Sequence, residues 1–146
     1  MIRTVNLLFF LCVGAGLAVA IYRTPKASLY IENQLPGEYF VVKEMTLTKP
    51  GFVVIYKANN YHKLGDEIVG IRQQLFPPGR YSDVHILRYN QSDKPKSERS
   101  NAAVSGGTLY FAVLYEDSDH NTVLSSGDRI MTDWLGREMM RPFMAR

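Results

Sequence analysis

The sequence is poor in the residues that several kinds of site require. Its single cysteine, Cys12, lies inside an apolar run, so the rest of the chain has no thiol for a disulfide or a blue-copper centre. No two of its three histidines, His62, His85 and His120, are at the spacing of zinc ligands. We therefore interpret each histidine as a surface residue of a strand or loop. Without disulfides, the stability of the fold must come from packing.

The chain also lacks a large excess of charge of either sign. The chain has 17 basic and 14 acidic residues, and its formal net charge of +3 is spread without a basic block, so nothing indicates a nucleic-acid partner. It has no glycine-rich phosphate loop, no dinucleotide-binding turn and no nucleophile elbow. The absence of these motifs predicts a protein that is not an enzyme.

What the chain does have, at its start, is a long apolar run. Residues 5–22 are 18 consecutive uncharged, mostly apolar positions, with Arg3 before them and Arg23 and Lys26 after them. A helix of this length measures roughly 27 Å, close to the roughly 30 Å hydrocarbon thickness of a bilayer. We therefore predict one N-terminal transmembrane helix. Residues 1–23 are the membrane anchor or signal peptide, and residues 5–22 contact the membrane.

The same run carries a signal for cleavage. Ala18, Val19 and Ala20 have the small-x-small pattern of a leader-peptidase site. Ile21 and Tyr22 continue the apolar run beyond that site, which favours an uncleaved anchor. Because the segment before the run is very short, we expect a single-pass protein of the cytoplasmic membrane with its large domain outside the cytoplasm. The alternative is a secreted or periplasmic protein released by leader cleavage.

Two further apolar runs are too short for helices. Residues 49–57 open with the turn signal Lys-Pro-Gly and continue with unbroken apolar positions, and residues 108–115 form a second run of equal quality. Their β-branched and aromatic content predicts strands that are covered on both faces. Two such strands favour an all-β fold. We predict an immunoglobulin-like antiparallel β-sandwich of about seven strands over residues 38–146, joined to the anchor by a tether over residues 24–37.

Weaker strand patterns flank these two runs. The middle of residues 80–89 alternates, with Val84 and Ile86 on one face and Asp83 and His85 on the other, and this pattern predicts a half-exposed strand. Further strands are expected at residues 28–32, 39–47 and 67–75.

Other segments leave two interpretations open. The turn that follows residue 47 suits either a hairpin or a corner between two sheets. Residues 90–103 are the least hydrophobic stretch and predict a long surface loop, which is either a contact loop or a tolerated insertion. After Gly136 we expect a closing strand, with a short helix as the alternative. Pro142 would restrict that strand to a sheet edge.

One loop resembles part of a calcium site. Asp117, Asp119 and Asn121 stand at alternate positions, where side-chain oxygens can converge on one hard cation, and Asp128 stands at position twelve. Position six is Thr122 rather than glycine, and position twelve is not glutamate, so the helix-flanked calcium motif is absent. The candidate metal ligands are Asp117, Asp119, Asn121 and Asp128, and the alternative is a hydrated loop between strands.

The order of several segments resembles that of a known family. The segments are PGFVVI at residues 50–55, EIVG at 67–70, LFPPG at 75–79, and GTLYFA at 107–112 followed by acidic residues. This order resembles a prokaryotic family of small exported β-sandwich domains of unknown function, over about residues 38–144. The resemblance implies export and a sandwich fold, and it brings no activity and no catalytic residue. The chain departs from the family's pattern in its longer 90–103 loop and in His120 and Asn121.

These observations favour a membrane-anchored extracytoplasmic β-sandwich that acts as a non-enzymatic binding or structural module of the cell envelope. We expect its partner to be another envelope protein, contacted through exposed strand edges or the 90–103 loop. The alternative is an adhesion or sensing domain that calcium stabilises. An enzyme with an unrecognised site is the least favoured interpretation.

Overall fold

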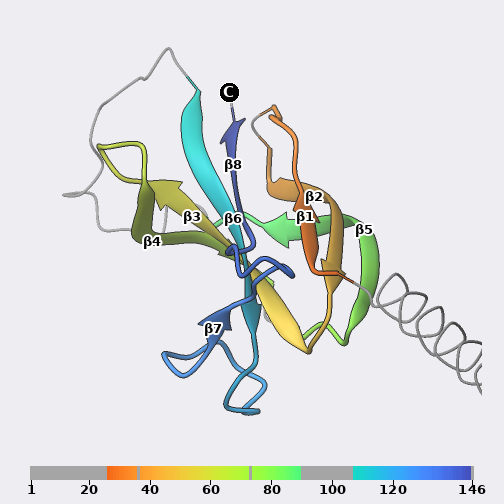
Figure 1. Ribbon diagram of the computed structural model, residues 1–146. Helices are drawn as coiled ribbons and strands as arrows, with labels where there is room; N and C mark the ends of the chain where they lie inside the picture. The colour runs from red at the N-terminus through yellow and green to blue at the C-terminus, as the bar shows by residue number, and fades with distance from the viewer. Residues whose placement is uncertain (1–25, 36, 73, 90–106, 146) are drawn as a thin grey trace, which may run out of the picture.

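Two antiparallel β-sheets form the described part of the protein, residues 26–35, 37–72, 74–89 and 107–145 of a computed structural model (Figure 1). The strands are β1 (Ser28–Tyr30), β2 (Tyr39–Leu47), β3 (Gly51–Ala58), β4 (Leu64–Ile71), β5 (Gly79–Leu87), β6 (Thr108–Glu116), β7 (Arg129–Ile130) and β8 (Met140–Ala145). The predicted all-β class is thereby confirmed. The predicted membrane helix and the 90–103 loop lie outside these residues, and the described ranges contain no helix with the length and apolarity to span a bilayer.

The two sheets differ in size. The smaller has the strand order β1-β2-β5, and the larger has the order β4-β3-β6-β7 with β8 also paired to β6. Figure 1 shows β1, β2 and β5 together on one side of the molecule and the larger sheet on the other. Since β2 pairs with β1 and β5 while β3 pairs with β4 and β6, the turn between β2 and β3 is a corner between sheets. Of the two interpretations of this turn, the hairpin is wrong.

The central strands β3 and β6 are buried as the two apolar runs predict. In β3, Val53 and Ile55 belong to the core shared by both sheets. Phe52 and Val54 alternate with them and are also buried, so they lie on the opposite face. In β6, Val113 pairs with Val54 and is buried on that same face. Full burial of each of these side chains contributes about 1.5–3 kcal/mol to folding, which explains why the runs contain no polar residue.

Strand β5 confirms the predicted alternation of buried and exposed residues, and at Asp83 the face that the alternating residues bury is exchanged. Val84 and Ile86 are buried, whereas Asp83 and His85 are exposed. Asp83 has a φ of 47°, in the left-handed region. On its N-terminal side Tyr81 packs against the core, whereas Ser82, which is in phase with Val84, is exposed. A shift of one residue in a strand exchanges its two faces, and Asp is one of the few residues that adopts this conformation readily.

Several strand ends differ from the sequence patterns. β4 begins at Leu64 and ends at Ile71, where the pattern predicted residues 67–75. It begins early because Asn59 Oδ1 accepts hydrogen bonds from the backbone N–H groups of Tyr61 and Lys63, which closes a tight turn after β3. It ends early because Phe76 exchanges two backbone hydrogen bonds with Gly51.

The chain ends in a strand rather than in the alternative short helix. β8 pairs with β6, and Pro142 stands opposite Phe111 in that pairing. On the other side of β8, the described residues make one bridge, between Gln34 and Ala145. The edge position predicted from Pro142 is confirmed, since a residue without an N–H cannot donate to a second neighbouring strand.

Residues 33 and 34 connect the last strand to the smaller sheet. The backbone N–H of Met144 donates to Asn33 Oδ1 at 2.8 Å, and the N–H of Gln34 donates to the Met144 carbonyl at 3.0 Å. Gln34 Oε1 also accepts a hydrogen bond from the N–H of Val41, in β2, at 2.8 Å. These three hydrogen bonds join β8 and β2, which belong to different sheets.

Candidate cation site

The connection between β6 and β7, residues 117–128, brings three carboxylates together. Asp117, Asp119 and Asp128 each place one oxygen within 4.8 Å of the oxygens of the other two. Figure 1 shows this connection extending beyond β7 at one end of the larger sheet. The sequence pattern named these three residues as candidate ligands, and the fold brings all three to one place.

Side chains of the loop build its shape by binding its own backbone. Asp128 accepts hydrogen bonds from the N–H of Ser118 at 3.1 Å through Oδ1 and from the N–H of Ser125 at 2.8 Å through Oδ2. His120 and Thr122 have φ angles of 56° and 62°, in the left-handed region. Such a loop folds back on itself, and this returns Asp128 to the start of the connection beside Asp117.

Asp117 is the unusual member of the cluster. The residue is 3% exposed, and it is the one charged or polar residue in the described ranges that is buried as a whole. Its Oδ1 has no hydrogen-bond partner. A buried polar atom without a partner costs about 1–3 kcal/mol, and a charged one costs more. An arrangement of this kind is retained where a further group supplies the missing interaction.

Asp119 is held in its ionised form. The hydroxyl of Ser125 donates to Asp119 Oδ2 at 2.7 Å. This bond, with those from the backbone N–H of Asn121 and from the Asp117 carboxyl, lowers the pKa of Asp119 against the opposing effect of burial. In the part of the chain that the structure describes, no lysine or arginine pairs with any of the three carboxylates. Their mutual repulsion is therefore not balanced by a basic side chain.

Asn121, the fourth candidate ligand, takes another part in the loop. Its Nδ2 donates to Asp119 Oδ2 at 2.7 Å, and its Oδ1 accepts a hydrogen bond from the N–H of Val123 at 2.7 Å. Both polar atoms of the side chain are thus engaged within the loop, and Asn121 acts here by positioning Asp119 rather than by offering an oxygen to the cluster.

Two residues that the sequence pattern did not single out help to shape the cluster. Ser125 orients Asp119, and Gly127 leaves room for it, because a Cβ on Gly127 would meet Asp119 Oδ2 at 2.8 Å. Both belong to the stretch Ser125-Ser126-Gly127-Asp128, which reads in the sequence as an ordinary turn. Only the convergence of that turn with Asp119 identifies their role.

The spacing of the three carboxylates suits calcium. Calcium binds oxygens at about 2.3–2.6 Å, so two oxygens on opposite sides of one ion lie about 4.6–5.2 Å apart. Oxygens within 4.8 Å of one another can therefore surround a single calcium ion. Magnesium demands near-ideal octahedral geometry at about 2.0–2.1 Å and usually keeps several waters, so it is commonly held by one or two carboxylates rather than three.

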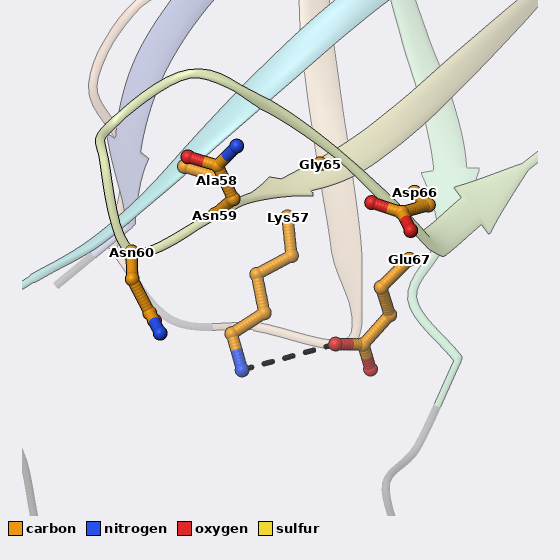
Figure 2. Close-up of a pocket in the computed structure, with 7 residues that line it drawn as sticks. All are labelled: Lys57, Ala58, Asn59, Asn60, Gly65, Asp66 and Glu67. Carbon is orange, nitrogen blue, oxygen red and sulfur yellow. Dashed lines mark ion pairs between the residues drawn. The ribbon is translucent and has the colours of Figure 1, made fainter.

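A second place of interest is the hollow of about 500 Å³ beside the β3–β4 turn. Figure 2 shows Lys57 and Glu67 pointing toward each other across it, with Asn60 on the turn above. Their charged atoms lie 3.9 Å apart. The hollow is open and polar, and its lining residues are Lys57, Ala58, Asn59, Asn60, Gly65, Asp66 and Glu67. No serine, threonine, cysteine or histidine is among these lining residues.

A second hollow, of about 510 Å³, lies where β4 ends beside β2 and β5. The rings of Tyr39 and His85 are 5.9 Å apart in its wall. Its lining residues are Tyr39, Ile71, Arg72, His85, Leu87 and Tyr89. The predicted surface position of the histidines is confirmed, since His85 is exposed on β5 and His62 and His120 are exposed in turns.

Comparison with known proteins gives no relative for this chain: no protein-family model, no curated protein and no solved structure matches it. The resemblance to a family of exported β-sandwich domains therefore stays a prediction, and the chemistry of the chain has to be argued from its own geometry.

Proposed function

We propose that the protein is a membrane-anchored, extracytoplasmic and non-enzymatic module of the cell envelope, and that calcium stabilises it by binding Asp117, Asp119 and Asp128. The observation that carries the calcium part is the buried Oδ1 of Asp117, which has no partner and belongs to the carboxylate cluster. A calcium ion at the cluster supplies that partner and offsets two of the three negative charges that the ionised carboxylates carry.

The position of the cluster links the ion to the stability of the sheet. Asp117 follows directly on β6, the strand that pairs with β3, β7 and β8, and its N–H donates to the Pro50 carbonyl at 3.0 Å. Asp128 directly precedes β7. A bound ion therefore ties the end of the central strand to the start of β7 and closes the connection between them.

The extracytoplasmic location makes such a site effective. Calcium sites of extracellular modules have dissociation constants of about 10⁻⁴–10⁻³ M, which only the calcium concentration outside the cytoplasm fills. At a calcium concentration about ten times the dissociation constant, binding adds about 1.4 kcal/mol to the free energy of unfolding. For a domain of this size, that corresponds to a rise in Tm of about 4–8 °C.

The module is proposed to work through its surface. Strands β1 and β5 flank β2 in the smaller sheet and β4 flanks β3 in the larger one, so their outer edges offer backbone groups to an envelope protein partner. The two hollows are open surfaces, one polar and one with tyrosine in its wall. Turnover of a substrate that a point mutation in residues 26–145 abolishes would contradict the non-enzymatic assignment.

Thermal unfolding of the full chain in detergent tests the calcium site. We expect Tm to rise with millimolar calcium, to rise less with magnesium, and to fall again with a chelator. Asp117→Asn should abolish the response to calcium, whereas the matched control Asp66→Asn, an exposed acid on β4, should keep it.

Two results would count against calcium. One is a Tm that millimolar calcium does not move. The other is evidence that the three carboxylates share a proton instead of binding a cation. In that case Asp117→Asn would raise Tm equally with and without calcium, and stability of the original chain would fall as the pH rises toward neutrality.

A further inference from the structure

A rigid hairpin between β7 and β8 presents two large apolar side chains to solvent. Its tip carries Trp134, which is 69% exposed, and Leu135, which is 56% exposed. Trp134 is the only tryptophan of the chain. Single exposed apolar residues are common, but two adjacent large ones at the tip of an ordered turn need an explanation.

The stem of the hairpin is fixed in the core. Met131 and Met139 are both buried, and the N–H of Met139 donates to the Met131 carbonyl at 2.8 Å. The N–H of Met131 donates to the carbonyl of Leu114, in β6, at 2.8 Å. Further out, Thr132 and Glu138 form a bridge. The tip therefore projects from a base that packs against the larger sheet.

The tip itself is ordered by Asp133. Its Oδ1 accepts hydrogen bonds from the N–H groups of Leu135 at 2.8 Å and Arg137 at 2.9 Å, and its Oδ2 accepts one from Arg137 Nε at 2.7 Å. Burial opposes ionisation of Asp133, but these hydrogen bonds outweigh it and lower its pKa. Gly136 has a φ of 74° and completes the turn. Both carboxylate oxygens of Asp133 thus bind the tip, and Trp134 and Leu135 lie exposed on it.

The hairpin lies beside the start of the described chain. Lys26 Nζ lies over the Trp134 ring, 5.1 Å from its centroid. Lys26 is four residues after Tyr22, the last residue of the apolar run that predicts the membrane helix. Four residues span at most about 14 Å, so the tip is close to the point where that helix would leave the bilayer.

We propose that Trp134 and Leu135 dock into the lipid interface next to the N-terminal anchor. Tryptophan is enriched at the level of the lipid headgroups, where its ring sits among apolar and polar groups together. Lys26, which lies against the Trp134 ring, carries a charge that suits lipid phosphates, whereas the charge of Arg137 is paired with Asp133. The proposal rests on the proposed membrane anchor. It adds a second point of attachment, which fixes the orientation of the β-sheets relative to the bilayer.

The single tryptophan makes a direct test available. The full chain is reconstituted into vesicles of phosphatidylcholine and phosphatidylglycerol, and the emission of Trp134 is measured with lipids brominated in the acyl chain and with acrylamide in the water. We expect brominated lipid to reduce the emission at least about twofold and acrylamide to quench it much less than in the chain in urea. Leu135→Ser should weaken the quenching by brominated lipid without releasing the chain from the vesicles.

A control moves the tryptophan to another exposed site. Trp134→Phe combined with Tyr61→Trp places the only tryptophan in the β3–β4 turn, where Tyr61 is 82% exposed. Figure 1 shows this turn, between β3 and β4, on the opposite side of the molecule from the start of β1. We expect this variant to be quenched by acrylamide and unaffected by brominated lipid.

The outcomes separate this inference from the proposed anchor. A chain that sediments with vesicles while Trp134 stays open to acrylamide and insensitive to brominated lipid overturns the docking of the tip and leaves the anchor standing. A chain that does not associate with vesicles contradicts both. Protection of Trp134 from both quenchers also overturns the inference, because a second copy of the protein then covers the tip.

Discussion

The two connections on either side of β7 are built alike and end differently. In each, an aspartate accepts hydrogen bonds from nearby backbone N–H groups, Asp128 in the acidic loop and Asp133 in the hairpin. The acidic loop leaves a buried carboxylate oxygen of Asp117 without a partner, whereas in the hairpin both carboxylate oxygens of Asp133 accept hydrogen bonds and Trp134 is exposed. A buried polar atom without a hydrogen-bond partner suits a small ligand such as a cation. Exposed apolar side chains on an ordered loop suit contact with an apolar surface such as a lipid bilayer.

The largest expected effect on stability comes from removing a core side chain under the hairpin while leaving the acidic loop unchanged. Met139→Ala deletes a buried side chain under the hairpin and should cost about 2–5 kcal/mol of unfolding free energy. Urea denaturation measures it, and Arg141→Ala, an exposed position on β8, should stay within about 0.5 kcal/mol. The calcium-dependent rise in Tm should persist in Met139→Ala, and its loss would show that the two connections do not act separately.

The next prediction disturbs the acidic loop without changing its charge. A Cβ at residue 127 would meet Asp119 Oδ2 at 2.8 Å, so Gly127→Ala should displace that carboxylate. We expect calcium affinity to fall about tenfold, an effect typical of residues that support a metal ligand. Calcium titration by calorimetry measures this, with Gly136→Ala in the hairpin as the matched glycine. An unchanged affinity would remove Asp119 from the ligand set.

Acid should weaken both connections in the same pH range. The pKa of Asp119 is lowered by its hydrogen bond from Ser125, and that of Asp133 by its bonds from Arg137 and Leu135, which overcome the effect of burial. Because both folded pKa values are depressed, the stabilisation is present above the unfolded value of about 3.9 and is lost as the pH falls through the folded values. Unfolding free energy measured at decreasing pH should drop less steeply in Asp133→Asn. An equal slope would contradict this assignment.

The smallest expected effect concerns the tip of the hairpin. Trp134→Ala removes a mostly exposed side chain and should change the unfolding free energy in detergent by no more than about 0.5 kcal/mol. Chemical denaturation followed by circular dichroism measures it. A loss above about 2 kcal/mol would mean that Trp134 stabilises the fold itself, and its exposure would then not need a lipid surface to account for it.

The sequence predicted best the parts of the fold where one physical effect dominates. The unbroken apolar run in β3 identified a strand covered on both faces because no polar residue tolerates that burial. The alternation around Val84 and Ile86 identified the two faces of β5 for the same reason. Where two backbone arrangements have about the same free energy, the sequence pattern could not distinguish them. The turn around Pro50 serves a hairpin as well as a corner, and only the pairing of β2 with β5 distinguishes them.

The candidate site was predictable in its residue types and not in its geometry. The spacing of Asp117 and Asp119 indicated convergent carboxylates, and Asp128 was named as well. Whether Asn121 offers an oxygen or a donor depends on the left-handed backbone of His120 and Thr122, which sequence patterns do not reveal for residues other than glycine. The hairpin tip was missed because Trp134 stands in a stretch with no strand periodicity, and its place beside Lys26 depends on contacts between distant parts of the chain.

The hydrogen bonds of Asn33 and Gln34 have a mechanical consequence. Under the proposed N-terminal anchoring, tension on the chain would reach the sheets at β1, a strand of three residues that could be peeled from β2 one pair at a time. Shortly after β1 in the chain, residues 33 and 34 form hydrogen bonds with the backbone of Met144, in β8, and with that of Val41, in β2. Peeling would stop there, because further extension must break bonds to two separate sheets at once. Residues 33 and 34 would therefore protect the two sheets from unfolding that starts at β1.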